Sequence, residues 1–168
     1  LSATLGVSRE IVNRSIADGM QNALVERTER GYRFIHDRVS EALNQSISAE
    51  QSKDLHQRIA ESFESMSTSA PQDSYALARH YILGHPERNP AKVYQTNLTA
   101  GRHALENFAN EKALEFLANA ISAARDSHIS AHDRGQIFEL VGLASTRTGK
   151  HDEAIKNFKI ALESLVSP

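Results

Sequence analysis

The sequence predicts a mainly α-helical protein with one short β-hairpin near its beginning. Alanine, leucine, glutamate and serine dominate, and aromatic residues form only 6% of the chain, which favours helices packed through small side chains. Apolar residues recur at the three- and four-residue spacing of amphipathic helices along most of the chain. The glycine and alanine positions around Gly101 reappear around Gly142, which indicates repeated helical units.

Composition and charge exclude several classes of protein. The chain of 168 residues has no cysteine, so disulfides, thiolate metal ligands and cysteine nucleophiles are excluded. No apolar run reaches the roughly 18 residues of a membrane span, and the N-terminus lacks the features of a signal peptide. We therefore expect a cytoplasmic protein without membrane partners. Because the chain begins without methionine and in the middle of a helical pattern, we expect it to be a fragment of a longer protein.

Residues 1–47 are predicted to form a winged-helix remnant, a fold with the order helix, helix, hairpin, helix. Ser8 can cap a helix. Leu24 and Val25 on one side, and Tyr32 to Ile35 on the other, flank a turn at Gly31 and read as a β-hairpin. A helix over 36–47 follows. The apolar residues of the first helix recur at helical spacing and are Ile11, Val12, Ile16, Met20, Ala23 and Leu24.

Residues 48–73 are predicted to be a linking helix and loop. Ser48 and Gln51 have the spacing of a capping box, in which each side chain satisfies the backbone of the other. Apolar residues at helical spacing follow as far as Met66. The run STSAPQD at 67–73 is rich in residues that break helices, and we predict a loop and domain boundary there.

Residues 74–168 are predicted to form helical repeats. A short helix from Tyr75 should end at Gly84, and Pro90 suits the first turn of a helix that runs to about Phe108. Three more helices are expected, at 111–125, from Ser130 to Gly149 and at 152–166. We predict that they begin at a cap formed by Asn110, at a cap formed by Ser130 with Asp133, and at Asp152, respectively.

The repeat itself resembles the tetratricopeptide pattern. Ala113, Leu117 and Ala120 return as Ala154, Phe158 and Ala161, each 41 positions later, and Gly101 returns as Gly142 at the same offset. In each unit the glycine precedes the first alanine by twelve residues, as in tetratricopeptide repeats, whose usual period is about 34. Small residues would let two antiparallel helices approach closely, with the leucine or phenylalanine beside them. We therefore predict a tetratricopeptide-like α-solenoid, whose concave surface suits a protein ligand.

The segment GYRFIHDRVSEAL, residues 31–43, resembles the end of the winged helix in STAND-type signalling ATPases, which are attached to bacterial kinases, nucleotide cyclases and transcription regulators. Its sharpest motif, Phe34-Ile35-His36-Asp37, is also similar to the Met-His-Asp motif of nucleotide-binding immune receptors. That resemblance implies that His36 senses the β-phosphate of ADP and that Asp37 supports it. It also implies a parent protein that binds ATP and ADP. The nucleotide-binding domain of that parent would lie upstream of these residues, since they contain no P-loop.

The histidines have simpler interpretations as well. Asp37 could act on the first turn of its helix through the helix dipole, while His36 merely ends the strand. His128 and His132 have a spacing that can place two metal ligands on one helical face, but solvated loop histidines explain them better. His80 and His85 straddle Gly84 and form a weaker pair still. No metal site and no catalytic residue are predicted in this chain.

DNA binding is the first alternative function. The arginines of the predicted helix and wing could contact phosphates. However, residues 1–47 hold six basic and six acidic side chains, interleaved, and duplex binding gains its affinity from uncompensated positive charge. We expect instead a non-catalytic regulatory module that contacts a nucleotide-binding domain of the same protein through its winged helix and a protein partner through its repeats. A free-standing repeat scaffold is the second alternative.

Overall fold

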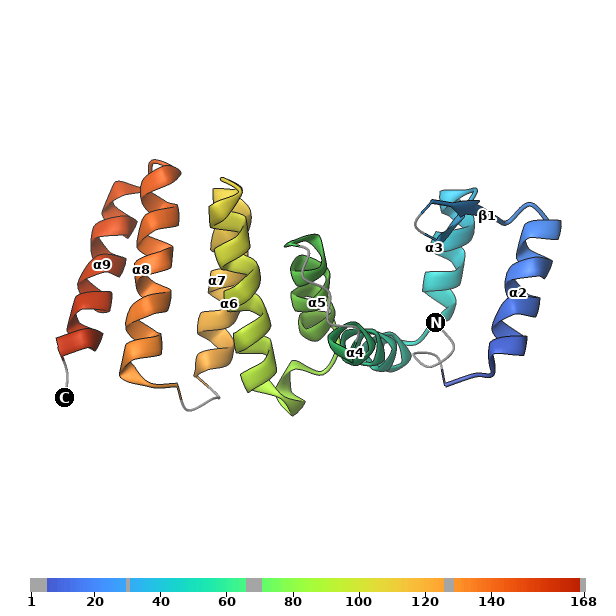
Figure 1. Cartoon of the computed structure of the whole chain (residues 1–168), viewed down its shortest axis with the longest axis horizontal. Coiled ribbons are helices and arrows are strands. Elements are labelled where there is room, and N and C mark those ends of the chain that lie inside the picture. The colour runs from blue at the N-terminus through green and yellow to red at the C-terminus, as the bar shows by residue number, and fades with distance from the viewer. Residues whose placement is uncertain (1–5, 30, 66–70, 126–128, 167–168) are drawn as a thin grey trace.

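The structure is a computed structural model that describes residues 6–29, 31–65, 71–125 and 129–166. Within these residues it contains eight α-helices, one 3-10 turn and a short antiparallel hairpin. The helices form a single row from α2 to α9, and consecutive helices from α4 onward pack side by side (Figure 1). The prediction of a mainly helical protein with one hairpin near its beginning is confirmed.

In the N-terminal part, the described residues contain one helix before the hairpin and one after it, whereas the predicted winged-helix order has two helices before the hairpin. Helix α2 (Arg9–Gln21) begins where the Ser8 hydroxyl accepts a hydrogen bond from the backbone N–H of Ile11 at 3.3 Å. Strands β1 (Val25–Thr28) and β2 (Gly31–Phe34) pair antiparallel, with Val25 opposite Phe34, and α3 (Asp37–Ser46) follows.

Most of the apolar residues that recur at helical spacing in the first helix are not buried. Of the residues of α2, all of which the structure describes, Val12 is buried, while Ile11 and Met20 are 56% and 44% exposed. No residue of α3, which is also described throughout, is buried. The reason is that α2 packs mainly against β1 and α3 against β2, and a two-stranded hairpin is too small to cover both helices.

Helices α4 and α5 follow. Helix α4 (Ala49–Ser65) begins at the predicted capping box, in which the Ser48 N–H donates to Gln51 Oε1 at 3.0 Å and the Gln51 N–H donates to Ser48 Oγ at 3.2 Å. Helix α5 (Pro71–Leu83) begins four residues before the predicted start at Tyr75. Of the predicted loop 67–73, residues 67–70 lie outside the described residues and 71–73 are helical, because proline is compatible with a first helical turn.

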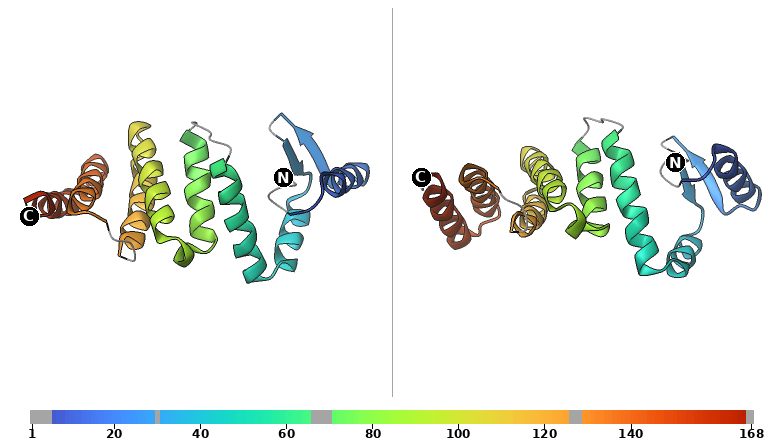
Figure 2. Two further views of the ribbon diagram at one scale, coloured as in Figure 1. Left: turned by 60° about the horizontal axis from the view of Figure 1, so that its bottom comes forward. Right: turned by 90° about the horizontal axis from the view of Figure 1, so that it is seen from below.

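The last four helices form two hairpins that are spaced as the repeat predicts. Helices α6 (Pro90–Glu106) and α7 (Asn110–Ala124) follow the turn η1 (Pro86–Arg88), and α8 (Ala131–Arg147) and α9 (His151–Val166) come 41 positions later (Figure 2). The predicted opening of α8 is confirmed, since the Asp133 N–H donates to Ser130 Oγ at 3.0 Å.

The equivalence extends to the turn inside each hairpin. Phe108 and Gly149, 41 positions apart, both adopt positive φ angles of 58° and 76°. The next residue in each turn donates its N–H back to the helix at 2.8 Å, from Ala109 to Ala104 O and from Lys150 to Ser145 O. In the first turn this places Ala109 at the cap of α7. The prediction that Asn110 caps this helix is therefore wrong, because Asn110 is already its first residue.

Both helix crossings rely on small residues, as the sequence predicts. A Cβ atom added to Gly101 of α6 would lie 2.9 Å from Leu117 Cδ2 of α7, and one added to Gly142 of α8 would lie 2.7 Å from Phe158 Cε1 of α9. Ala113 is fully buried and Ala154 is nearly so. The two crossings differ in their surroundings, however, because Leu117 is fully buried whereas Phe158 is 41% exposed.

The buried core follows the row of helices from α4 to α8 and is centred on α5, α6 and α7. Polar contacts join the elements around it. Tyr81 of α5 donates its hydroxyl hydrogen to Glu64 of α4 at 2.9 Å, and Lys92 of α6 pairs with the same carboxylate. Arg147 of α8 donates to the carbonyl of Leu105 at the end of α6 at 2.9 Å. Within the described segments, no helix has the length and apolar character that crossing a bilayer requires.

Candidate functional site

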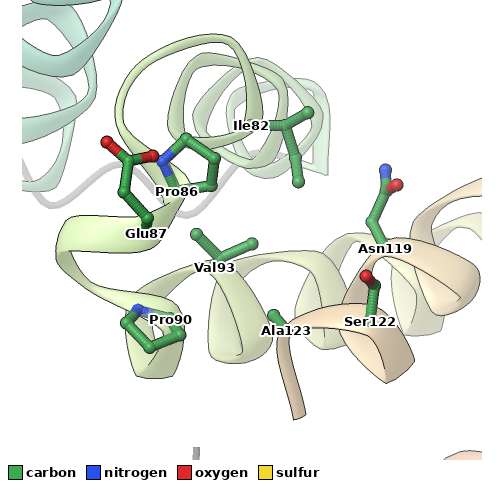
Figure 3. A pocket seen from close by; sticks show the side chains of 8 residues that line it. All are labelled: Ile82, Pro86, Glu87, Pro90, Val93, Asn119, Ser122 and Ala123. Carbon is green, nitrogen blue, oxygen red and sulfur yellow. The ribbon is translucent and has the colours of Figure 1, made fainter. Parts of the chain in front are cut away.

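A shallow hollow lies where the end of α5, the turn η1, the start of α6 and the end of α7 meet (Figure 3). Its volume is about 280 Å³. Ile82, Pro86 and Val93 give it an apolar floor, and Asn119 and Ser122 of α7 border it with polar side chains. Prolines are well suited to this place, because Pro86 opens the turn and Pro90 the next helix without a backbone N–H to satisfy.

A second hollow of about 390 Å³ adjoins the first along α5, α6 and α7. Ile82 and Asn119 line both hollows, and we name the two adjoining hollows together the α5–α7 groove. Tyr75 and Phe116 contribute an aromatic pair to the second hollow, with ring centroids 5.3 Å apart and an interplanar angle of 25°.

The second hollow also has polar groups that could orient a ligand. Arg79, Lys112 and Glu115 line it with charged side chains of both signs. Asn97 lies at its floor and is fully buried; its Nδ2 donates to the Val93 carbonyl at 2.9 Å. The other side-chain atom, Oδ1, accepts no hydrogen bond from any residue that the structure describes. A buried amide oxygen without a donor is rare in native proteins, but Asn97 is fully buried, so this oxygen is not exposed at the surface of the hollow.

The groove combines features that suit an extended peptide. It consists of two adjoining hollows that are lined by aromatic and aliphatic side chains together with amide and charged side chains. Small-molecule sites are usually single cavities of about 300–1,000 Å³ that enclose most of the ligand. Two adjoining shallow hollows fit successive side chains of a peptide better than one enclosed ligand.

The predicted sensor residues lie elsewhere in the molecule. His36 precedes α3 in an extended conformation, with φ −120° and ψ 125°, and its exposed side chain makes no capping hydrogen bond to this fully described helix. Asp37 is the first residue of α3 and is exposed as well. Figure 1 shows α3, which begins at Asp37, on the opposite side of α4 from α5, α6 and α7, the helices that line the α5–α7 groove.

Several of the histidines and arginines that are weaker candidates for metal or DNA binding have other partners in the structure. His128 lies outside the described residues, and His132 on the surface of α8 shares a hydrogen bond with Gln136 at 2.8 Å. His80 contacts a different histidine from the predicted His85: its Nδ1 lies 2.8 Å from Nδ1 of His56 on α4. On the predicted wing, Arg33 pairs with Glu26 across the two strands.

The His56–His80 pair is a predictable source of acid sensitivity. Burial lowers the pKa of His80, and so do His56 and Arg79. Burial and Arg79 also lower the pKa of His56. Both imidazoles therefore bind protons more weakly in the folded chain than a histidine with the ordinary pKa of 6.5 does. The unfolded chain binds protons first, so the pair contributes its full stability above pH 6.5 and loses it as the pH falls below that value.

We expect the melting temperature of the chain to fall between about pH 6.5 and pH 5, and the double variant His56→Gln, His80→Gln to show a smaller fall. The hydrogen bond with Lys92 lowers the pKa of Glu64 from its ordinary value of 4.5, so this group changes the stability only below about pH 4.5. Thermal unfolding monitored by circular dichroism at several pH values measures this difference. His132→Gln on the surface serves as the control, and an equal fall in all three proteins would contradict the assignment.

Comparison with known proteins adds no family to this description. No family model, no curated protein and no solved structure matches the chain.

Proposed function

We propose that this chain is a non-catalytic protein-interaction module that binds an extended segment of a partner protein in the α5–α7 groove. The observation that carries this proposal is the groove itself, in which aromatic and aliphatic side chains lie beside amide and charged ones. The finer assignment to tetratricopeptide-like repeats belongs to the same proposal. It is supported by the crossings at Gly101 and Gly142 and by the 41-residue equivalence of α6–α7 and α8–α9.

The regulatory part of the proposal concerns residues 1–47, which we assign to a winged helix that packs against a nucleotide-binding domain of a signal-transducing ATPase. The resemblance of residues 31–43 to STAND-type ATPases suggests this partner. Large apolar side chains that remain exposed in this part of the chain support it, because exposed apolar surface often marks an interaction site. They are Ile11, Met20, Leu24, Phe34, Ile35 and Leu43, each at least 40% exposed. His36 would then sense ADP in that domain, with Asp37 beside it.

The groove is tested by selection of peptides from a displayed random library on the purified chain, followed by calorimetry. Asn119→Arg should weaken the binding of selected peptides at least about tenfold, because Asn119 is half-buried and borders both hollows. The matched control is Glu139→Arg, an exposed charge change on α8 away from the groove. Peptides that bind Asn119→Arg as tightly as the unmodified chain, or a library without enrichment, would refute the groove as the binding site.

A further inference from the structure

His85 is the most deeply buried histidine among the residues that the structure describes, and it lies among carboxylates. Its side chain is 3% exposed. Its Nε2 atom lies 2.8 Å from Asp54 Oδ1 and 3.9 Å from Glu50 Oε1, both on α4, while its Nδ1 atom lies 3.2 Å from Glu87 Oε1 in the turn η1. Both nitrogens of one buried ring therefore face carboxylate oxygens.

The hydrogen-bonding capacity of a neutral imidazole does not satisfy this arrangement. A carboxylate accepts hydrogen bonds and donates none, and a neutral imidazole has a single N–H. If Nδ1–H donates to Glu87, the lone pair of Nε2 points at Asp54 and Glu50. That contact is favourable only when a cation stands between the groups, either a second ring proton or a metal ion.

We propose that Glu50, Asp54 and His85 form a binding site for a divalent first-row metal ion of the zinc class. Their three ligand atoms lie within 4.8 Å of one another. Two ligands of a tetrahedral zinc ion at about 2.0–2.2 Å lie about 3.3–3.6 Å apart. His85 Nε2 lies 2.8 Å from Asp54 Oδ1 and 3.9 Å from Glu50 Oε1, so the two carboxylates need to move only a few tenths of an ångström to bind the ion. One imidazole and two carboxylates are donors that such ions accept, and three protein ligands leave coordination positions for water.

The surroundings orient the ligands for this purpose. Glu50 and Asp54 lie one turn apart on α4, and their exposed side chains can adjust to an ion. The position of His85 is fixed, because its backbone N–H donates to Gln57 Oε1 at 3.4 Å. Glu87 accepts from the far nitrogen of the ring, as the carboxylates behind metal-bound histidines do. Figure 3 shows this carboxylate turned away from Val93 and the groove, although Glu87 itself borders the groove.

Arg88 is the competing cation. Its guanidinium lies 3.8 Å from Asp54 and 4.0 Å from Glu50, at the outer limit of an ion pair, and its side chain is 56% exposed. It can therefore move into solvent when a metal ion binds. Without Arg88 and a charged His85, the three carboxylates Glu50, Asp54 and Glu87 leave a concentrated negative charge that a divalent cation would neutralise.

The proposal is tested by titration of Zn²⁺ into the chelator-treated full chain by calorimetry. We expect one equivalent to bind and the melting temperature to rise with Zn²⁺ concentration, because the site exists only in the folded chain. The double variant Glu50→Gln, Asp54→Asn should lose this equivalent, and Glu87→Gln should weaken it roughly 10- to 100-fold. Arg88→Gln should strengthen it, since the competing charge is removed.

Two further results distinguish this metal site from the histidine pair and from a simple salt bridge. The variant His56→Gln, His80→Gln should keep the equivalent, so its loss there would overturn the proposal in favour of the histidine pair. Melting temperatures of the metal-free proteins show that each variant is folded. No stoichiometric binding by the unmodified chain, together with a lowered metal-free melting temperature of Arg88→Gln, would show that the cluster is an ion-pair network and not a metal site.

Discussion

Gly101→Leu is expected to lower the free energy of unfolding by about 3 kcal/mol, at the upper end of the cost of overpacking a core. Even the first added atom would lie 2.9 Å from both Leu117 Cδ2 and Cγ. Leu117 is fully buried and has no empty space to move into, so the helices α6 and α7 must separate. Because domains are stable by only about 5–15 kcal/mol, urea denaturation will show this loss clearly.

The equivalent substitution Gly142→Leu provides a matched control. The gain in helix propensity on replacing glycine, about 1 kcal/mol, is similar at both positions. Phe158, the neighbour of Gly142, is 41% exposed, and its ring can turn outward. Gly142→Leu should therefore cost clearly less than Gly101→Leu, and the exposed substitution Lys156→Ala should stay within about 0.5 kcal/mol. Equal losses at Gly101 and Gly142 would mean that the closeness of α6 to α7 does not decide stability.

The second large effect concerns His36 in the complete signalling ATPase that we propose. His36→Ala should speed ADP release about 10- to 150-fold, which corresponds to the roughly 1.5–3 kcal/mol of a charge-assisted hydrogen bond to phosphate. The basal output of the protein should rise, because the resting state loses a contact that the active state does not make. Release of a fluorescent ADP analogue in stopped flow measures the rate.

The isolated chain separates this role from a structural one. His36 is exposed and does not cap α3, so His36→Ala should change the free energy of unfolding by less than about 0.5 kcal/mol. The control in the complete protein is Arg38→Lys, which keeps the charge of an exposed helical residue. Unchanged ADP release together with a lowered melting point would assign His36 to folding alone.

Features that depend on neighbouring residues could be predicted from the sequence. Ser8, Ser48 with Gln51, and Ser130 with Asp133 form the expected caps, because a cap needs only three or four consecutive residues. The close approach at Gly101 could also be predicted, since the repeat supplies a second copy of the same spacing. The predicted cap at Asn110 is wrong because the turn before it, not the residue type, decides which residue precedes the helix.

Features that join distant parts of the chain could not be predicted. His85 meets Asp54 across 31 positions and His56 meets His80 across 24, and no spacing within one helix predicts either contact. The α5–α7 groove likewise combines residues of three helices, of which Asn97 and Asn119 are not distinguished in the sequence. The first helix has an apolar face in its residue pattern, but whether that face is buried depends on how large a neighbour is available to cover it.

The arrangement of the helices in a row has a consequence for how the chain folds. Element pairs with substantial contact are neighbours, or nearly neighbours, along the described chain, so each contact closes a short loop and the contact order is low. Loop-closure entropy is then a small obstacle, and folding is expected to be fast. Nucleation should start in the hairpin α6–α7, where the core is centred, and spread toward both ends as in other linear arrays. Under a pulling force, such a row of helices would unfold from its two ends, and the α5–α7 groove would be the last part to unfold.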